Sequence, residues 1–137
     1  MALILDSGVL YALLDRRDAS HPACRDLVMN AEETLVIPSP VLIEVDYFIT
    51  QRLQTQQRLD LLDDIRSGGY LVENLLPEDY ERVFEICSIY NDADVGFVDA
   101  AVLAIVERFS EPKLATLDRR HFGMMRPHHV AALRLLP

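Results

Sequence analysis

Short aliphatic runs alternate with amphipathic helical patterns along the whole chain, and this alternation limits the possible folds more than any other feature. Runs with the length and apolar character of buried strands occur at Leu3–Leu5, Thr34–Ile37, Tyr70–Val72, Lys113–Thr116 and, more briefly, Ala131–Leu135. The segments between them carry apolar residues three and four positions apart, as amphipathic helices do. Strands separated by helices predict parallel βαβ units, so we expect an α/β fold with three layers, α/β/α, and a central, mostly parallel sheet of four to five strands.

The helices predicted from this spacing occupy most of the chain. We expect them from Ser7 (as N-cap) to Leu14, from about Ser20 to Ala31, from Val41 to Arg52, from Thr55 to Arg66, from Pro77 to Tyr90 and from Val95 to Val106. The length of 137 residues suits a single domain spanning residues 1–137.

The amino-acid composition limits the kinds of molecule that this protein is expected to bind. The net charge of −9 argues against an unspecific DNA coat or a binder of anionic membranes, but it is compatible with a nucleic-acid enzyme that recruits cations to an acidic pocket. No charged-then-apolar leader and no long apolar span occur, which predicts a cytoplasmic protein without membrane insertion. Cys24 and Cys87 each lie inside a helical pattern, where reduced core thiols are expected.

Four carboxylates stand alone in apolar surroundings. Asp6 follows the first predicted strand, Glu44 lies early in the helix after the second, Asp99 is the only charge in the most apolar helix, and Asp118 comes directly after the fourth strand. In a parallel sheet, strand ends and the following helix starts share one edge, so all four acids are expected to converge there.

Converging carboxylates repel one another unless a cation compensates them. Hard divalent ions, Mg²⁺ or Mn²⁺, are the natural partners of an all-oxygen site, and the lack of a Cys or His ligand pattern argues against zinc. Each acid taken singly also suits a helix cap or a hydrogen-bonded core acid. Asp46, two residues from Glu44, is an alternative ligand that periodicity does not exclude, whereas Asp92 and Asp94 fit an exposed turn.

The segments around these acids, taken in order, resemble PIN-domain ribonucleases, specifically the VapC toxins of bacterial toxin–antitoxin pairs. The resemblance lies in Ile4–Leu13, Pro38–Val45, Val95–Ala101 and Ala115–Phe122, and it runs the full length without a large insertion. It implies a PIN-domain-like α/β/α fold and a homodimer. One departure is the sequence Asp92-Ala93-Asp94-Val95, where the family pattern often has one Asp followed by apolar residues and Pro.

The resemblance also implies roles for individual residues. Asp6, Glu44, Asp99 and Asp118 would form the catalytic, metal-binding pocket, with Asp6 and Asp99 as the firmest ligands. Ser7 and Thr116 would hold carboxylates or water by hydrogen bonds. The implied activity is Mg²⁺- or Mn²⁺-dependent endonucleolytic cleavage of a structured or translation-related RNA, neutralised by a VapB-type antitoxin.

Positive charge for RNA contact follows the fourth acid directly, at Arg119, Arg120 and His121, where a solvated surface cluster is the alternative. Two other functions remain open. One is a PIN-like binding module that cuts nothing. The other is an aspartate-based phosphotransfer domain, against which stand the lack of a second acid two residues after Asp6 and the position of the only lysine, Lys113, before its strand.

Overall fold

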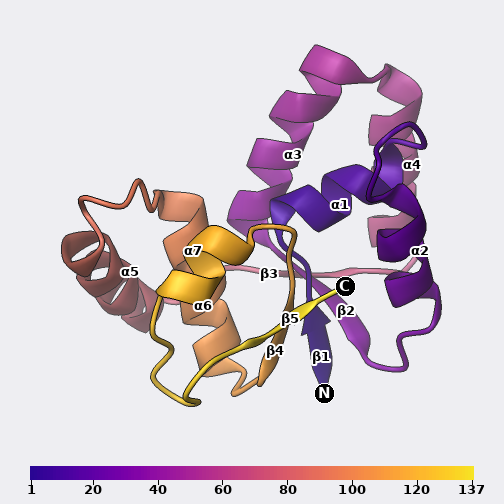
Figure 1. Ribbon diagram of the computed structural model, residues 1–137. Helices are drawn as coiled ribbons and strands as arrows, with labels where there is room; N and C mark the ends of the chain where they lie inside the picture. The colour runs from indigo at the N-terminus through magenta and orange to yellow at the C-terminus, as the bar shows by residue number, and fades with distance from the viewer.

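The strands lie together at the centre of the molecule, with α1–α4 on one side of the view and α5–α7 on the other (Figure 1). The structure is a computed structural model that describes residues 1–137. The elements in chain order are β1 (Ala2–Ile4), α1 (Ser7–Leu14), α2 (His21–Met29), β2 (Thr34–Pro38), α3 (Ser39–Arg52), α4 (Thr55–Arg66), β3 (Leu71–Glu73), α5 (Pro77–Ile89), α6 (Phe97–Arg108), β4 (Lys113–Ala115), α7 (Arg119–Met124) and β5 (Arg134–Leu136).

All strand pairs are parallel, as predicted, but the strands do not form one continuous sheet. β1, β2 and β3 form a three-stranded sheet in that order, and β4 pairs with β5 in a separate two-stranded sheet. A single bridge between Leu5 and Ala115 joins the two sheets. The prediction of a central sheet of four to five strands was therefore wrong, because β1 and β4 are three residues long and meet only at their carboxyl ends.

The joint between the sheets lies directly before Asp6. The Leu5 N–H donates to the Val36 carbonyl of β2 at 2.9 Å, and the Asp6 N–H donates to the Ala115 carbonyl of β4 at 2.9 Å. Two successive residues thus bond to opposite neighbours. This holds the Asp6 backbone at the carboxyl edge where the two sheets meet.

The most apolar helix is the centre of the core, as its sequence predicts. Every residue from Ala100 to Val106 in α6 is buried. The helix packs against α5 and α3, so Asp99 in its first turn is held by a rigid, fully packed element. None of the helices of this chain is long and apolar enough to span a membrane.

Helix starts differ from the predictions at three places, one of which is α6, which begins at Phe97 and not at Val95. Asp6, not Ser7, occupies the N-cap position of α1, and α3 begins at Ser39 with Pro40 in its first turn, two residues before the predicted start. The short helix α7 was not predicted at all. Asp118 is its N-cap, and its side chain accepts a hydrogen bond from the His121 N–H at 2.9 Å.

Candidate metal centre

Asp6 is buried at the carboxyl end of β1 and is held by a threonine from the neighbouring sheet. The Thr116 hydroxyl donates to Asp6 Oδ2 at 2.7 Å and accepts from the Asp118 N–H at 3.0 Å. Thr116 therefore links two acids that lie more than a hundred positions apart in the sequence. The Ser7 hydroxyl, for which a similar hydrogen bond was expected, is buried without any hydrogen-bond partner.

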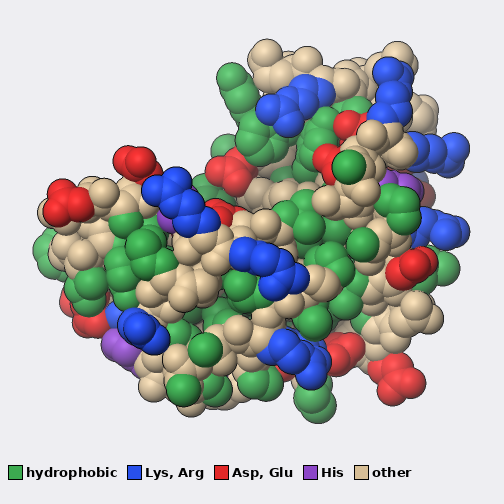
Figure 2. All heavy atoms as spheres, in the orientation of Figure 1, with side chains coloured by type: hydrophobic (Ala, Val, Ile, Leu, Met, Phe, Trp, Pro, Cys, Tyr) green, Lys and Arg blue, Asp and Glu red, His purple; other side chains and the backbone are tan.

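The three other predicted acids come from three further elements. Glu44 lies in the second turn of α3, Asp99 in the first turn of α6, and Asp118 at the N-cap of α7. All three are half-buried. A notch between α3 and the α5–α7 side of the molecule carries acidic side chains along its edge (Figure 2).

The ionisation of Asp6 and Asp99 depends on burial and on the charges of the other acids. Burial raises the pKa of Asp6 to about 6, and the charges of Asp99 and Glu44 add to that rise, while hydrogen bonds from Thr116 and the Ser7 backbone oppose it. Burial is also the largest cause of the raised pKa of Asp99, followed by the charge of Asp118, with Glu44 contributing. Asp6 and Asp99 therefore each feel the charge of other acids of this set.

His121 takes part in this cluster, which the sequence did not indicate. Its Nδ1 lies 2.8 Å from Asp118 Oδ2 and 3.2 Å from Asp99 Oδ2. Its Nε2 lies 3.1 Å from the Ala93 carbonyl oxygen. The expected RNA-contacting side chain thus points at the acids. Its i, i+3 spacing from Asp118 was the available signal, but it is informative only once α7 is known to be helical.

The remaining candidates lie outside the cluster. Asp46 pairs with Arg58 of α4, which removes it as an alternative to Glu44. Asp92 and Asp94 are exposed in the turn before α6, as expected for turn residues. Arg119 donates to the Pro137 carbonyl at 2.6 Å, and Arg120 is exposed.

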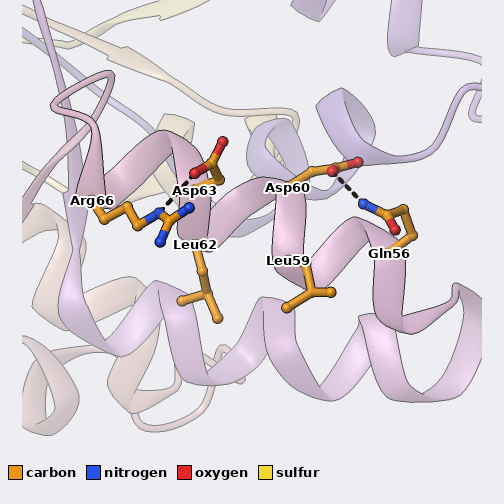
Figure 3. A pocket seen from close by; sticks show the side chains of 6 residues that line it. All are labelled: Gln56, Leu59, Asp60, Leu62, Asp63 and Arg66. Atoms are coloured by element: carbon orange, nitrogen blue, oxygen red, sulfur yellow. Dashed lines mark hydrogen bonds and ion pairs between the residues drawn. The ribbon is translucent and has the colours of Figure 1, made fainter.

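A second hollow lies on α4 and offers no comparable chemistry (Figure 3). Its carboxylates are already engaged, Asp63 with Arg66 at 2.7 Å and Asp60 with the Gln56 amide at 2.8 Å. Leu59 and Leu62 complete the lining. The acid cluster is therefore the stronger candidate for a functional site.

Comparison with known proteins places the chain in a family. The model of the PIN domain family matches residues 3–124, which is most of the chain and includes all four acids. The chain belongs to the PIN domain family. This confirms the resemblance found in the sequence.

Relatives within and beyond the curated proteins agree with this PIN assignment. The chain is 29% identical over 125 residues to ribonuclease VapC26 of Mycobacterium tuberculosis, covering 91% of this chain and 93% of that protein. Its fold matches the crystal structure of VapC20 of M. tuberculosis, described as a sarcin–ricin loop cleaving toxin, with a TM-score of 0.78 at 18% identity, over 86% of this chain and 91% of that one.

The fold also matches VapBC2 of Rickettsia felis, solved bound to a DNA fragment from its promoter, with a TM-score of 0.71 at 17% identity over the whole of both chains. FitAcB of Neisseria gonorrhoeae matches with a TM-score of 0.61 at 14% identity, over all of this chain and 97% of that one. The predicted PIN-like α/β fold is thereby confirmed.

The residues of this PIN domain fit a divalent cation. Carboxylate oxygens are the donors that Mg²⁺ and Mn²⁺ prefer, and here they come from α3 and α6 and from the N-cap residues of α1 and α7. The pKa values of Asp6 and Asp99 are raised mainly by burial and in part by the charges of neighbouring acids, so a bound cation would favour their ionised forms.

Proposed function

We propose that this PIN domain is a Mg²⁺- or Mn²⁺-dependent endoribonuclease that acts as the toxin of a type II toxin–antitoxin pair in the cytoplasm. The convergence of Asp6, Glu44, Asp99 and Asp118 at one edge of the strands carries the proposal. The curated relative, a ribonuclease, supports the reaction type. The substrate in this proposal is a structured RNA of the translation machinery.

In the proposed mechanism Asp6 and Asp99 would be the firmest ligands of the ion, and Glu44 and Asp118 would hold it directly or through water. A bound divalent ion supplies a polarised water and compensates the charge that develops on the scissile phosphate. Thr116 fixes the Asp6 carboxylate by donating to its Oδ2. Arg120, exposed at the start of α7, would contact RNA phosphate, whereas the Arg119 side chain donates to the Pro137 carbonyl.

Two alternatives have less support. A PIN-like binding module without catalysis would need no complete set of four acids. A phosphotransfer domain would need a lysine near the phosphoryl group, but the only lysine, Lys113, starts β4 at the far end from the acids. There it pairs with Glu33 at 3.1 Å and Glu111 at 3.4 Å.

The proposal includes two protein partners, a VapB-type antitoxin and a second copy of this chain. Large apolar side chains are exposed on α3 and α5, among them Ile43 at 77% and Phe84 at 73% exposure. Exposed apolar groups of this size are typical of surfaces that bind other proteins. Light scattering on the purified chain tests the homodimer, and a monomeric mass at working concentration would contradict it.

The purified chain is expected to cut RNA internally in Mg²⁺ or Mn²⁺ and to stop when the ion is removed. The experiment follows cleavage of ribosomal and transfer RNA on denaturing gels, first with ion, then with excess EDTA, then with ion restored. Loss and recovery of cleavage support the metal mechanism. Cleavage by a homogeneous preparation in excess EDTA would contradict it.

A rise in pH is expected to destabilise the metal-free protein, and a bound metal ion is expected to offset that loss. The pKa of Asp6 is raised from 3.8 to about 6 in the folded chain. The stabilisation from its protonated form is therefore fully present below the unfolded pKa and is lost as pH rises through 6. The loss is about 3 kcal/mol of unfolding free energy at most, and a bound cation offsets it.

Thermal unfolding at pH 5 and pH 7.5, with and without Mn²⁺, measures this effect. The ion is expected to raise the melting temperature more at pH 7.5 than at pH 5. In the Asp6→Asn variant the metal-free protein should lose less stability between the two pH values than wild type. Equal pH dependence in the two proteins would show that Asp6 is not the titrating group.

A further inference from the structure

The His121 ring has an oxygen atom opposite each of its nitrogens. On one side, Nε2 lies 3.1 Å from the Ala93 carbonyl oxygen in the turn before α6. On the other, Nδ1 faces Asp118 Oδ2 at 2.8 Å and Asp99 Oδ2 at 3.2 Å. The ring is mostly buried, with 17% of the side chain exposed.

The backbone carbonyl determines the hydrogen on this ring. A carbonyl oxygen only accepts, so Nε2 carries the hydrogen that donates to Ala93. In the neutral ring Nδ1 then presents a lone pair to two carboxylate oxygens. Three such atoms repel one another unless a cation lies among them, either a proton on Nδ1 or a metal ion.

The separations suit a metal ion. One ligand atom from each of Asp99, Asp118 and His121 lies within 4.8 Å of the other two. Neighbouring ligands of an octahedral ion with bonds of about 2.1 Å lie about 3 Å apart. The two Nδ1–carboxylate distances, 2.8 Å and 3.2 Å, bracket that value.

We propose that His121 is a nitrogen ligand of the metal centre, together with Asp99 and Asp118, and that it makes the centre selective for a first-row transition ion such as Mn²⁺ over Mg²⁺. The inference rests on the proposed function and adds a ligand and an ion preference to it. Imidazole nitrogen binds first-row transition ions, Mn²⁺ the most weakly of the series, whereas Mg²⁺ prefers oxygen ligands and bound water.

The surroundings of His121 are those of a metal-binding histidine. Such a ring commonly donates its other N–H to a backbone carbonyl, which fixes the tautomer and the ring orientation, and Ala93 supplies that carbonyl. The residue after this carbonyl, Asp94, has a left-handed backbone conformation, with φ at 58°.

A purely structural role would use the same residues differently. As the N-cap of α7, Asp118 needs only Oδ1, which accepts from the His121 N–H at 2.9 Å. The second oxygen, Oδ2, is not needed for the cap, and neither is Asp99. The cap therefore does not account for the approach of Asp99 Oδ2 and Asp118 Oδ2 to His121 Nδ1.

Pulsed electron paramagnetic resonance of the Mn²⁺-loaded protein, recorded without RNA, tests the assignment. Wild type is expected to show ¹⁴N modulation from a directly bound imidazole. The His121→Gln variant should bind Mn²⁺ without that modulation. The control variant is His128→Gln, whose ring lies 3.2 Å from Glu85 on the exposed surface and is 60% exposed, and it should keep the signal.

Calorimetric titration with Mn²⁺ and with Mg²⁺ gives the selectivity. The ratio of the two affinities is expected to fall at least about tenfold in His121→Gln and to stay unchanged in His128→Gln. An unchanged ratio in His121→Gln would overturn the proposal. If His121→Gln does not fold, the wild-type spectrum alone tests whether His121 binds the ion. Bound Mn²⁺ without ¹⁴N modulation would exclude the nitrogen ligand.

The outcomes separate this inference from the proposed function. RNA cleavage by a wild-type protein that lacks ¹⁴N modulation would overturn the histidine ligand and leave the nuclease intact. A nitrogen-bound Mn²⁺ in a protein that cuts no RNA would support the histidine ligand and overturn the nuclease.

Discussion

The Asp99→Asn protein is expected to fold like wild type and to cut RNA at least about 1,000-fold more slowly, a loss of about 4 kcal/mol of transition-state stabilisation. Asp99 Oδ2 lies 3.2 Å from His121 Nδ1, and its carboxyl group feels the charges of Asp118 and Glu44, so in the proposed function its charge would hold both the ion and the histidine. Asparagine keeps the size of the side chain but removes that charge.

The Asp99→Asn substitution is expected to lower the rate of RNA cleavage without lowering the stability of the metal-free protein. Burial raises the pKa of Asp99, and the charge of Asp118 raises it further, so the ionised side chain costs the metal-free protein free energy near neutral pH. Replacing it with a neutral group relieves that repulsion. The melting temperature of metal-free Asp99→Asn at pH 7.5 is therefore expected to equal or exceed that of wild type.

Single-turnover cleavage rates and thermal unfolding measure the two effects, and growth arrest on expression gives the cellular readout. Asp46→Asn is the matched control, since Asp46 is an exposed acid of α3 that pairs with Arg58 and lies outside the cluster. It should cut RNA and arrest growth as wild type does. Metal-dependent cleavage at an unchanged rate by folded Asp99→Asn would contradict the assignment of this acid.

The four acids stood out in the sequence because each is the lone carboxylate of an apolar stretch. Such a residue needs a partner when it is buried, and strand order alone brings the carboxyl ends together. Asp46 and Glu44 were not separable by the same reasoning. They lie two residues apart, and the deciding contact is with Arg58, on the next helix.

His121 and the division of the sheet depended on geometry that no pattern expresses. α7 has six residues with Gly123 among them, too few to show helical periodicity, so the side of the chain on which His121 lies was undetermined. Likewise, the strands β1 and β4 were correctly placed. The two strands meet at only one bridge because the Leu5 N–H bonds to β2 and only the next N–H, that of Asp6, bonds to β4.

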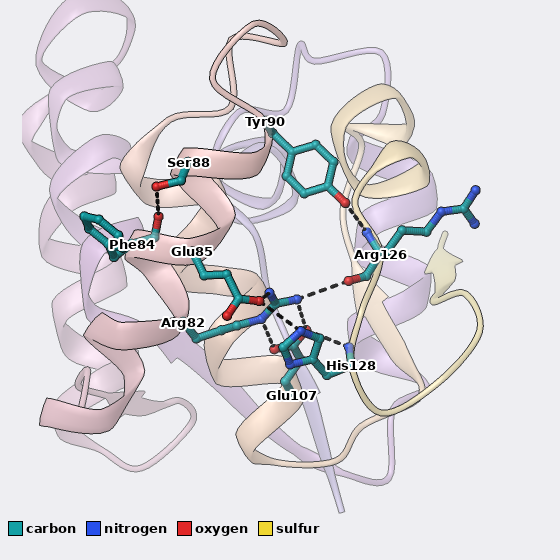
Figure 4. Close-up of polar contacts among 8 residues, drawn as sticks. All are labelled: Arg82, Phe84, Glu85, Ser88, Tyr90, Glu107, Arg126 and His128. Carbon is teal, nitrogen blue, oxygen red and sulfur yellow. Dashed lines mark hydrogen bonds and ion pairs between the residues drawn. The ribbon is translucent and has the colours of Figure 1, made fainter.

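The largest loss of stability is expected from Glu107→Ala, which should lower the unfolding free energy by about 3–5 kcal/mol. Glu107, on α6, is 10% exposed and accepts from Arg82 Nε at 2.7 Å and Nη2 at 2.9 Å. It also accepts from the backbone N–H of His128 at 2.9 Å. Figure 4 shows these groups converging on one carboxylate. Its removal leaves a mostly buried guanidinium without its main partner.

Glu85→Ala is the matched control, because Glu85 accepts from the same arginine, at Nη1 and 2.6 Å, but is 49% exposed. It should cost at most about 1 kcal/mol, since water screens an exposed pair. Urea unfolding of both variants gives the comparison, and equal losses of unfolding free energy would show that burial does not set the energy here.

Arg82 also donates to the Arg126 carbonyl at 3.1 Å. The network thus ties the segment after α7 to α5 and α6. Asp99 lies in the first turn of α6 and Asp118 caps α7, so Glu107→Ala is also expected to weaken metal binding by loosening α6 against the segment after α7.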